Sequence, residues 1–446
     1  MPAPVVYPVA TFRGAPRQAP NGIPRRLGIA LELLAQAIVA LLTPFNVLLW
    51  LIFRPPQTLR VFLMSRIVRD SRWLTPFIIA NEGKYSASHK PRRTLIPYGD
   101  IEKTVTITNV TAPPAKRQPA APPVVRPAET YGFILSPNGA KGKGTEKAKP
   151  GEKIIIYYHG GAYVIGHPMW TPFPLKIARD TRTRVYSSNY RKTASPGTAW
   201  PAQLQDGLSA WEYVTRELEF EPHNVILMGE SAGGHLSLAI STQLSEWGLT
   251  VPGGLALCSP WLDPTLSFER DPKSWSDYLS HRWAGYTVPS LLRHLTPEGT
   301  ASKLVSPGIQ PPGSFKNLVD GKTVFVSVGT TEMLGTEIYS FIKTLKNEGV
   351  KTSVFEDPYG LHIAPVLTLL APGPATYTKF AAGVKGLVRD IDAANKERAK
   401  EQAAKEIVKE APKEAAKEAP KETAKEATKD TAKASANGSA NGSAKK

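Results

Sequence analysis

The sequence predicts an α/β fold in which helices cover both faces of a mostly parallel sheet. Two kinds of segment alternate through the central part of the chain: short runs rich in β-branched and aromatic residues, and amphipathic stretches of helical length. The runs are nearly continuous in apolar residues, as expected for strands buried on both faces. A serine flanked by glycines follows one of these runs, so chemistry is expected at the ends of the strands.

Eight runs share this composition and are predicted as strands: KTVTITNV, YGFILSP, KIIIYYHG, TRVYSSNY, NVILMG, GLALCSP, KTVFVSVG and KTSVFEDP. The helix-length stretches between them include AQLQDGLSAWEYVTREL, GGHLSLAISTQLSEWG and EIYSFIKTLKNEG. Strands that alternate with helices in this way indicate crossover connections and a parallel sheet. We therefore expect one domain with an eight-stranded sheet over residues 98–392.

The composition excludes several classes of protein. Of 446 residues, 41% are apolar and 9% aromatic, which excludes a wholly disordered or fibrous chain. The one cysteine, Cys258, can form neither an intrachain disulfide nor a cysteine-ligated metal cluster. Of the net charge of +17, residues 1–93 carry +10 and residues 396–446 carry +4, which leaves +3 between them. A nearly neutral central region argues against a nucleic-acid partner and favours a membrane surface.

A long apolar run lies near the N-terminus. Residues 27–53 are almost wholly apolar, and from Leu33 onward no charged residue occurs for 21 residues, enough for a helix to cross a hydrocarbon layer of about 30 Å. We predict a single transmembrane or signal-anchor helix here, after a basic segment over residues 1–26. Pro44 and Asn46 leave a second interpretation open, a kinked hairpin that lies in the plane of a membrane.

Two regions are expected to form a cap over the sheet. Residues 54–97 mix apolar and basic residues, which is typical of a segment that lies on a membrane or covers an active site. Residues 264–312 are expected to complete the cap and to shape a substrate pocket. Simple core packing is the competing interpretation of their aromatic residues, which include Trp275, Tyr278, Trp283 and Tyr286.

The C-terminal tract over residues 396–446 is predicted to be disordered. It repeats Lys, Glu and Ala with a four-residue period and offers no apolar face to a domain. Pairs of Lys and Glu four residues apart could support a solvated helix, but Pro412 and Pro420 interrupt it.

The most specific chemical signal is NVILMGESAGGHLSLAI, in which a Gly-x-Ser-x-Gly motif spans Gly229 to Gly233. The motif follows a predicted strand and precedes a predicted helix, an arrangement that raises the central serine above the sheet. The glycines leave room for a strained backbone, and the N-terminus of the helix favours negative charge near Ser231. Ser231 is therefore the predicted nucleophile; the alternative is a glycine turn with an incidental serine.

A His-Gly-Gly turn ends the predicted strand in KIIIYYHGGAYVIG, about 70 residues before the serine. Backbone N–H groups held in such a turn can stabilise the oxyanion that forms during acyl transfer. We assign this role to the amides of Gly160, Gly161 and Ala162, joined by Ala232 after the nucleophile. His159 is expected to orient the loop and not to act as a base.

A serine nucleophile on this type of sheet requires a base and an acid, in the chain order serine, acid, histidine. Among the histidines, only His362 lies in a loop just after the last predicted strand, from which its imidazole could reach over Ser231. His235 comes only four residues after the nucleophile, on the helix that leads away from it. His362 is therefore the predicted base.

Three carboxylates compete for the role of the acid. Glu332 follows a predicted strand and comes 30 residues before His362, and it is the preferred candidate. Asp263 lies at the end of the preceding strand and is its rival, and Asp357 on the last strand is a third candidate.

With HGGAY, GESAGG, GTTEMLGTE and GLHIAP in this order, residues 98–392 resemble the hormone-sensitive-lipase-like branch of α/β-hydrolase esterases. The resemblance implies a serine ester hydrolase that needs no metal or organic cofactor, with Ser231 as nucleophile, His362 as base and Glu332 at a position usually held by Asp. Ala162 replaces the third glycine of the family's HGGG motif and adds a methyl group to the acyl site. Residues 191–193 also depart from the usual Arg-Leu-Ala.

An N-terminal anchor before such a domain is similar to fungal steryl acetyl hydrolases of the endoplasmic reticulum. That similarity implies a single-pass protein of this membrane that hydrolyses a small lipophilic ester, with deacetylation of steryl acetates as one form of the reaction. A carboxylesterase of fungal secondary metabolism fits the same residues. A non-catalytic hydrolase-fold receptor or scaffold is the alternative from another class, although such relatives typically lose the serine or the histidine, and both remain here.

Overall fold

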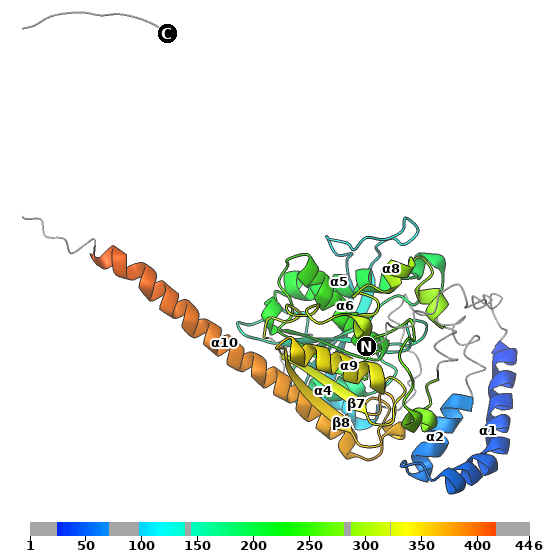
Figure 1. The fold of residues 1–446 in the computed structure, drawn as a ribbon. Coiled ribbons are helices and arrows are strands. Elements are labelled where there is room, and N and C mark those ends of the chain that lie inside the picture. Colours follow the sequence, from blue (N-terminus) through cyan, green and yellow to red (C-terminus); the bar gives the residue numbers. More distant parts are fainter. Residues whose placement is uncertain (1–24, 71–97, 139–143, 281–286, 322, 416–446) are drawn as a thin grey trace, which may run out of the picture. The chain divides into compact units, whose positions relative to one another are not determined.

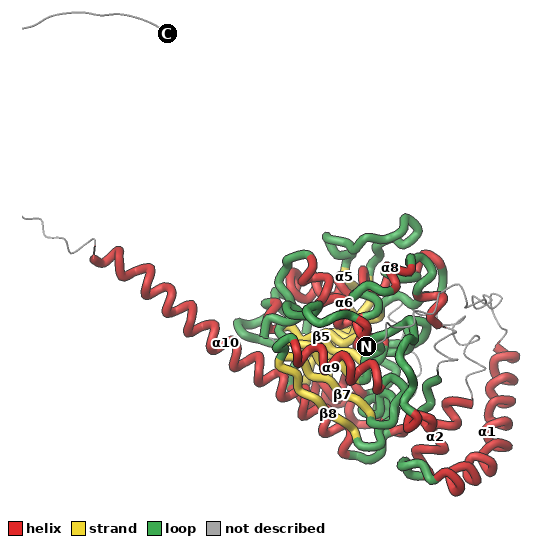
Figure 2. The backbone as a smooth tube through the Cα atoms, in the orientation of Figure 1, coloured by secondary structure: helices red, strands yellow, loops and turns green. Residues whose placement is uncertain are grey.

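The structure of the protein is a computed structural model that describes residues 25–70, 98–138, 144–280, 287–321 and 323–415. Its centre is an eight-stranded sheet in the order β1-β2-β4-β3-β5-β6-β7-β8 (Figure 1; Figure 2). The second strand pairs antiparallel with both of its neighbours, and every other pair is parallel. The prediction of a mostly parallel, eight-stranded sheet is confirmed.

Each of the eight predicted runs contains one strand. The strands are β1 (Val105–Ala112), β2 (Thr130–Pro137), β3 (Ile154–Tyr158), β4 (Arg184–Asn189), β5 (Val225–Glu230), β6 (Gly254–Cys258), β7 (Thr323–Gly329) and β8 (Lys351–Asp357). From β3 to β7 every strand residue is buried, because helices cover both faces of these central strands.

Two apolar cores lie on opposite faces of the sheet, and β3 contributes alternate residues to each. Ile154 and Ile156 point into the core shared with α5 (Ala202–Glu212), α6 (Ala232–Glu246) and α9 (Gly335–Asn347). Ile155 points into the core shared with α4 (Phe173–Thr181) and the first turns of α10 (Ala375–Ala415). The remaining helical segments are short: η3 (Gly99–Thr104), η4 (Pro196–Thr198), the π-helical turn η5 (Tyr213–Glu217), η6 (Pro222–Asn224), η7 (Pro272–Ser276), α8 (Pro297–Thr300), η8 (Pro307–Ile309) and η9 (Thr368–Leu370).

The N-terminal apolar run forms α1 (Arg25–Phe53), which is followed by α2 (Leu59–Asp70). Within the described residues, no helix combines the length and the apolar character needed to cross a bilayer, so the transmembrane prediction for residues 27–53 is not supported. The second half of α1 curves towards α2 and packs against it (Figure 1). The buried Asn46 of α1 accepts a hydrogen bond of 3.1 Å from the Arg66 guanidinium, a polar contact between two helices of the protein itself.

The chain divides into two compact units, Met1–Asn395 and Lys396–Lys446, at the boundary predicted for the tail. Helix α10 continues to Ala415, so the first part of the tail is helical where disorder was predicted. Glu residues three positions before Lys residues, as in Glu406 and Lys409, favour a solvated helix along this stretch. Residues 416–446 lie outside the described residues, as do residues 1–24 of the predicted basic segment 1–26 and residues 71–97 of the predicted cap segment 54–97.

Gly233 makes the closest backbone approach in the sheet–helix core. A Cβ atom at this position would lie 1.9 Å from the Tyr158 carbonyl oxygen at the end of β3. We therefore expect Gly233→Ala to lower the free energy of unfolding by about 2–3 kcal/mol, measured by urea denaturation. Gly386→Ala is the matched control, because a Cβ there meets nothing within 4 Å. Equal stability of the two variants would contradict this packing.

Candidate active site

Ser231 occupies the turn between β5 and α6 in a strained conformation. Its φ of 55° and ψ of −121° are rare for a residue with a side chain, and such strain is typical of a nucleophile on a sharp strand-to-helix turn. The Ser231 N–H donates to the Cys258 carbonyl at 3.0 Å, and the Ser231 carbonyl accepts from the Trp261 N–H at 3.0 Å. These two bonds fix the turn to the carboxyl end of β6.

Glu332 and His362 meet at the neighbouring strand ends. Glu332 follows β7, His362 lies in the loop after β8, and Glu332 Oε2 lies 3.5 Å from His362 Nδ1. Both side chains are buried, 0% exposed for Glu332 and 2% for His362. The Ile363 N–H donates to the Ser259 hydroxyl at 3.2 Å, and Ser259 directly follows the residue that accepts from Ser231. The histidine loop and the serine turn are therefore both attached to the end of β6.

Burial raises the pKa of Glu332 to about 8, and hydrogen bonding from Ser259 and from the Gly329 backbone opposes the rise. A cation beside a buried carboxylate stabilises its charged form. The geometry places the His362 imidazole in that position.

The two rival carboxylates are engaged elsewhere. The Asp263 carboxylate accepts hydrogen bonds from the backbone and hydroxyl groups of Thr265 and Ser267, all within its own turn. Asp357 accepts from the Thr376 hydroxyl at 3.1 Å, and burial raises its pKa to about 6. Of the three candidates, the contact with the His362 ring is made by Glu332.

Two other histidines, His235 and His159, are buried and make contacts typical of a structural role. His235 on α6 uses both ring nitrogens, with the Tyr163 hydroxyl at 2.5 Å and the Val305 carbonyl at 2.8 Å, and burial lowers its pKa to about 4. His159 stacks on Tyr190 with ring centroids 4.4 Å apart, and burial lowers its pKa well below the usual value.

The loop after β3 lies against the serine turn, but one of its amides is already engaged. The Gly160 N–H, one of the amides assigned to an oxyanion, donates to Glu230 Oε1 at 2.7 Å and so already has a partner in the structure. Gly161 and Ala162 follow with φ values of 112° and 49°, left-handed conformations that turn the loop back on itself. The remaining amides assigned to this role are those of Gly161, Ala162 and Ala232.

Glu230 is a residue of the site that the sequence analysis missed. It is 4% exposed and lies between Gly229 and the serine, and burial raises its pKa to about 8 while hydrogen bonds from Gly160 and Tyr157 lower it. Its signal in the sequence was an acidic residue at the end of an otherwise apolar strand. Such a residue needs buried donors, and the glycine loop supplies one of them.

The predicted cap residues divide between two roles. The Tyr278 ring centroid lies 6.0 Å from that of His362, which places this residue beside the base. Trp275 packs against Phe53 and Phe62, with ring centroids 5.8 and 5.6 Å away, which matches core packing. Trp283 and Tyr286 lie outside the described residues.

The segment that departs from the usual Arg-Leu-Ala is held by buried polar contacts. Arg191 forms an ion pair of 2.8 Å with the buried Asp206, and burial raises the pKa of Asp206 while Arg191 opposes the rise. Lys192 is fully buried and donates to the Asn189 side chain at 3.1 Å.

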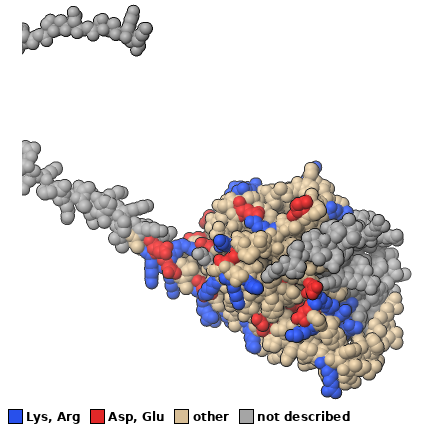
Figure 3. Space-filling view, viewed as in Figure 1, with Lys and Arg blue, Asp and Glu red and all other residues tan. Residues whose placement is uncertain are grey.

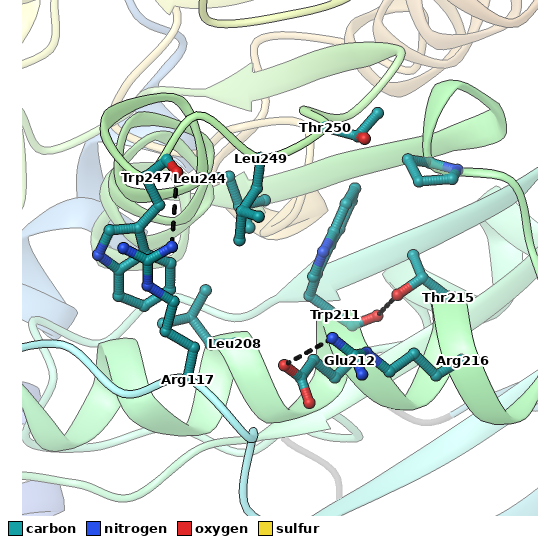
Figure 4. Close-up of a pocket in the computed structure, with 11 residues that line it drawn as sticks. Arg117, Leu208, Trp211, Glu212, Thr215, Arg216, Leu244, Trp247, Leu249 and Thr250 are labelled. Atoms are coloured by element: carbon teal, nitrogen blue, oxygen red, sulfur yellow. Dashed lines mark hydrogen bonds and ion pairs between the residues drawn. The ribbon is translucent and has the colours of Figure 1, made fainter.

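A small pocket of about 150 Å³ lies at the opposite ends of the strands (Figure 4). Trp211 and Trp247 line it together with Pro222 and Thr250, which precede β5 and β6, whereas Ser231 follows β5. It is therefore separate from the serine turn. Within the described part of the chain, no group of three or more His, Cys, Asp or Glu residues is arranged to hold a metal ion.

Known proteins with similar sequences indicate the family that this fold and site resemble. Residues 155–365 match a family model described as alpha/beta hydrolase fold. A putative acetyl-hydrolase of Mycobacterium tuberculosis is 28% identical over 161 residues, 35% of this chain and 48% of that protein. A versiconal hemiacetal acetate esterase of Aspergillus parasiticus is 32% identical over 130 residues, 28% of this chain and 40% of that protein. The chain spans less than half the length of these curated relatives.

Solved structures show the same fold at low sequence identity. A carboxyl esterase of the mycorrhizal fungus Tuber melanosporum superposes with a TM-score of 0.53 at 15% identity, over 70% of this chain and 98% of that one. A thermostable esterase of Pseudomonas putida superposes with a TM-score of 0.56 at 15% identity, over 75% of this chain and 98% of that one. The strand order, the strained serine turn, the family match over residues 155–365 and the solved structures together show that this chain has the α/β-hydrolase fold.

Proposed function

We propose that this protein is a serine hydrolase of carboxylic esters. The observation that carries the proposal is the arrangement at the carboxyl ends of the strands: a strained serine at the N-terminus of α6 and a histidine whose ring contacts a buried glutamate. The acetyl-hydrolases and esterases among its sequence relatives support the same class of reaction.

The mechanism proceeds by acyl transfer through two half-reactions. Ser231 Oγ attacks the ester carbonyl carbon while His362 takes up the hydroxyl proton, and Glu332 stabilises the imidazolium that forms. The amides of Gly161, Ala162 and Ala232 stabilise the oxyanion. His362 then donates the proton to the leaving alcohol. In the second half His362 takes a proton from a water molecule that attacks the acyl carbon, and it returns this proton to Ser231 Oγ as the bond to the serine breaks and the acid is released.

The substrate we propose is the acetate ester of a lipophilic alcohol, with steryl acetates as one candidate. The two relatives described above are named for acetyl groups, which supports a short acyl chain. Ala162, in the loop where the family motif has a third glycine, is 3% exposed. The Tyr278 ring, 6.0 Å from the His362 ring between centroids, places an aromatic surface beside the proposed base, which suits a lipophilic alcohol.

We also propose that α1 lies in the plane of a membrane surface. Leu41, Phe45, Leu48 and Ile52 are spaced to share one helix face and are 78%, 55%, 52% and 62% exposed. No acidic residue occurs from residue 33 to residue 69, whereas four arginines do. The surface over α1 is almost free of charged side chains in Figure 3. Such a face favours the boundary between lipid headgroups and acyl chains, and the absence of acidic residues beside it favours anionic lipids.

Replacement of the nucleophile tests the reaction class. Ser231→Ala is expected to lower kcat for p-nitrophenyl acetate by about 10⁴-fold or more and to abolish labelling by a fluorophosphonate, because no hydroxyl remains to attack. Ser245→Ala, near the end of the same helix, is the control and should retain both activities. Hydrolysis or labelling that persists in Ser231→Ala would refute the proposal, as would a wild-type protein that neither hydrolyses esters nor labels.

The identity of the acid is tested with amide substitutions. We expect Glu332→Gln to lower kcat/KM by about 10³- to 10⁴-fold and Asp263→Asn to change it less than about tenfold, with active sites counted by fluorophosphonate titration. Burial raises the pKa of Glu332 to about 8, so the pair of Glu332 and His362 loses its shared proton only near this pH. We therefore expect wild-type kcat/KM to rise as the pH is raised towards about 8.

In Glu332→Gln the acid limb of the pH profile should move to lower pH, because the anion that stabilises protonated imidazole is gone. A large loss of activity in Asp263→Asn with little loss in Glu332→Gln would assign the acid to Asp263 instead.

Sedimentation with lipid vesicles tests the membrane surface. We expect the protein to bind vesicles of equal parts phosphatidylcholine and phosphatidylserine, and the triple variant Leu41→Ser, Leu48→Ser, Ile52→Ser to bind at least about tenfold more weakly. The control replaces Val124 and Leu249 by Ser, two exposed apolar residues outside α1. Equal binding by the triple variant and the control would exclude α1 as the contact.

A further inference from the structure

Gln57 lies in the short connection between α1 and α2, yet its side chain is 3% exposed and reaches the strand ends near the proposed acid. Gln57 Nε2 donates to the Thr331 hydroxyl at 2.7 Å and lies 3.5 Å from the Tyr359 carbonyl oxygen. Gln57 Oε1 accepts from the Ser276 hydroxyl at 3.0 Å. One amide therefore joins three loops that are far apart in the sequence.

Each of these three loops carries a group that surrounds the base. Thr331 directly precedes Glu332, and its hydroxyl donates to the Gly360 carbonyl at 2.9 Å, in the loop that leads to His362. Ser276 precedes Asp277, whose carboxylate accepts from the Met333 N–H at 2.7 Å. The acid turn is thus held from both sides of Glu332.

Asp277 is a second buried carboxylate close to the base. It is fully buried, and the next residue, Tyr278, packs its ring beside His362. Burial raises the pKa of Asp277, and the charge of His362 acts in the opposite direction, as expected for a carboxylate near a protonated imidazole. The position of the 276–278 segment therefore affects the electrostatic environment of the base.

Helix α2 holds this segment in place independently of the glutamine. The Ser65 hydroxyl donates to the Ser276 carbonyl at 2.9 Å, and the Arg69 guanidinium donates to the Trp275 carbonyl at 2.7 Å. The Trp275 ring packs against Phe62 of the same helix. The Gln57 amide therefore bonds on one side to Ser276, in the segment that α2 holds, and on the other side to Thr331, next to Glu332.

We propose that Gln57 is a positioning residue for the catalytic acid and base, because its amide joins the turn of Glu332 and the loop of His362 to the segment that α2 fixes. The proposal rests on the proposed ester hydrolysis and deepens it. If Gln57 has this role, α1, α2 and their connection help to hold the acid and the base in place. A shift of the acid by a fraction of an ångström is enough to lower the rate of proton transfer.

Gln57→Met keeps the size of the side chain and removes both of its hydrogen-bonding groups. We expect kcat for p-nitrophenyl acetate to fall by about 10- to 100-fold and KM to change by less than about threefold, because the hydrogen bonds of Gln57 support the acid and base and not the substrate. Gln57→Glu keeps an oxygen that can accept from Ser276 and should fall between Gln57→Met and wild type. Rates are expressed per site titrated with fluorophosphonate, so unfolded protein does not count.

Two further variants make the test specific. Gln310→Met is the matched control, because the Gln310 amide also donates two hydrogen bonds, to the Ala301 and Ser306 carbonyls, away from the acid turn. It should keep wild-type kcat. Thr331→Val removes the hydroxyl that accepts from Gln57, so the double variant Gln57→Met, Thr331→Val should lose no more kcat than the more damaging single variant.

The outcomes separate this inference from the function on which it rests. Four results would each overturn the positioning role while ester hydrolysis stands. Gln57→Met could keep the wild-type kcat, or it could change only KM. Gln310→Met could lose as much kcat as Gln57→Met, or the losses of kcat in the double variant could be additive. A wild-type protein that neither hydrolyses esters nor labels with fluorophosphonate would overturn both.

Discussion

The site depends on the close approach of two pieces of backbone at the start of α6. Gly229 and Gly233 lie within van der Waals contact of main-chain atoms, and a Cβ on either would overlap a carbonyl oxygen at 2.2 or 1.9 Å. This contact lets the helix begin directly over the ends of β3 and β5, which forces Ser231 into its positive φ. From this position the Ser231 turn bonds to Cys258 and Trp261 at the end of β6, and the loop of His362 is attached to the same end through Ser259.

The sheet and the serine turn could be predicted from the sequence because their signals are local. A strand such as Ile154–Tyr158, buried along its whole length, is visible as an uninterrupted apolar run, and the glycine spacing around Ser231 is contained in five residues. The choice between Glu332 and Asp263 was harder, because both follow strands. Thr265 and Ser267, which occupy the Asp263 carboxylate within its own turn, are the signal that could have separated them.

Contacts between distant residues could not be predicted in this way. The Gly160 amide meets its partner 70 residues later, and Gln57 meets Thr331 across 274 residues, so no spacing rule indicates either contact. The contact between Asn46 of α1 and Arg66 of α2 likewise joins residues 20 positions apart, and the apolar run around Asn46 gives no indication of it. Composition alone also missed the helical part of the tail, where Glu and Lys residues three positions apart favour a helix despite the absence of an apolar face.

The bond between Glu230 and Gly160 has a consequence for how the site can adapt to different substrates. Glu230 is covalently adjacent to the nucleophile, and its carboxylate holds the first amide of the oxyanion loop. This hydrogen bond ties the serine turn to the first residue of the glycine loop, so the two segments are held together before any ligand arrives. In the proposed reaction, little reorganisation of one segment relative to the other is then needed when the new bond forms.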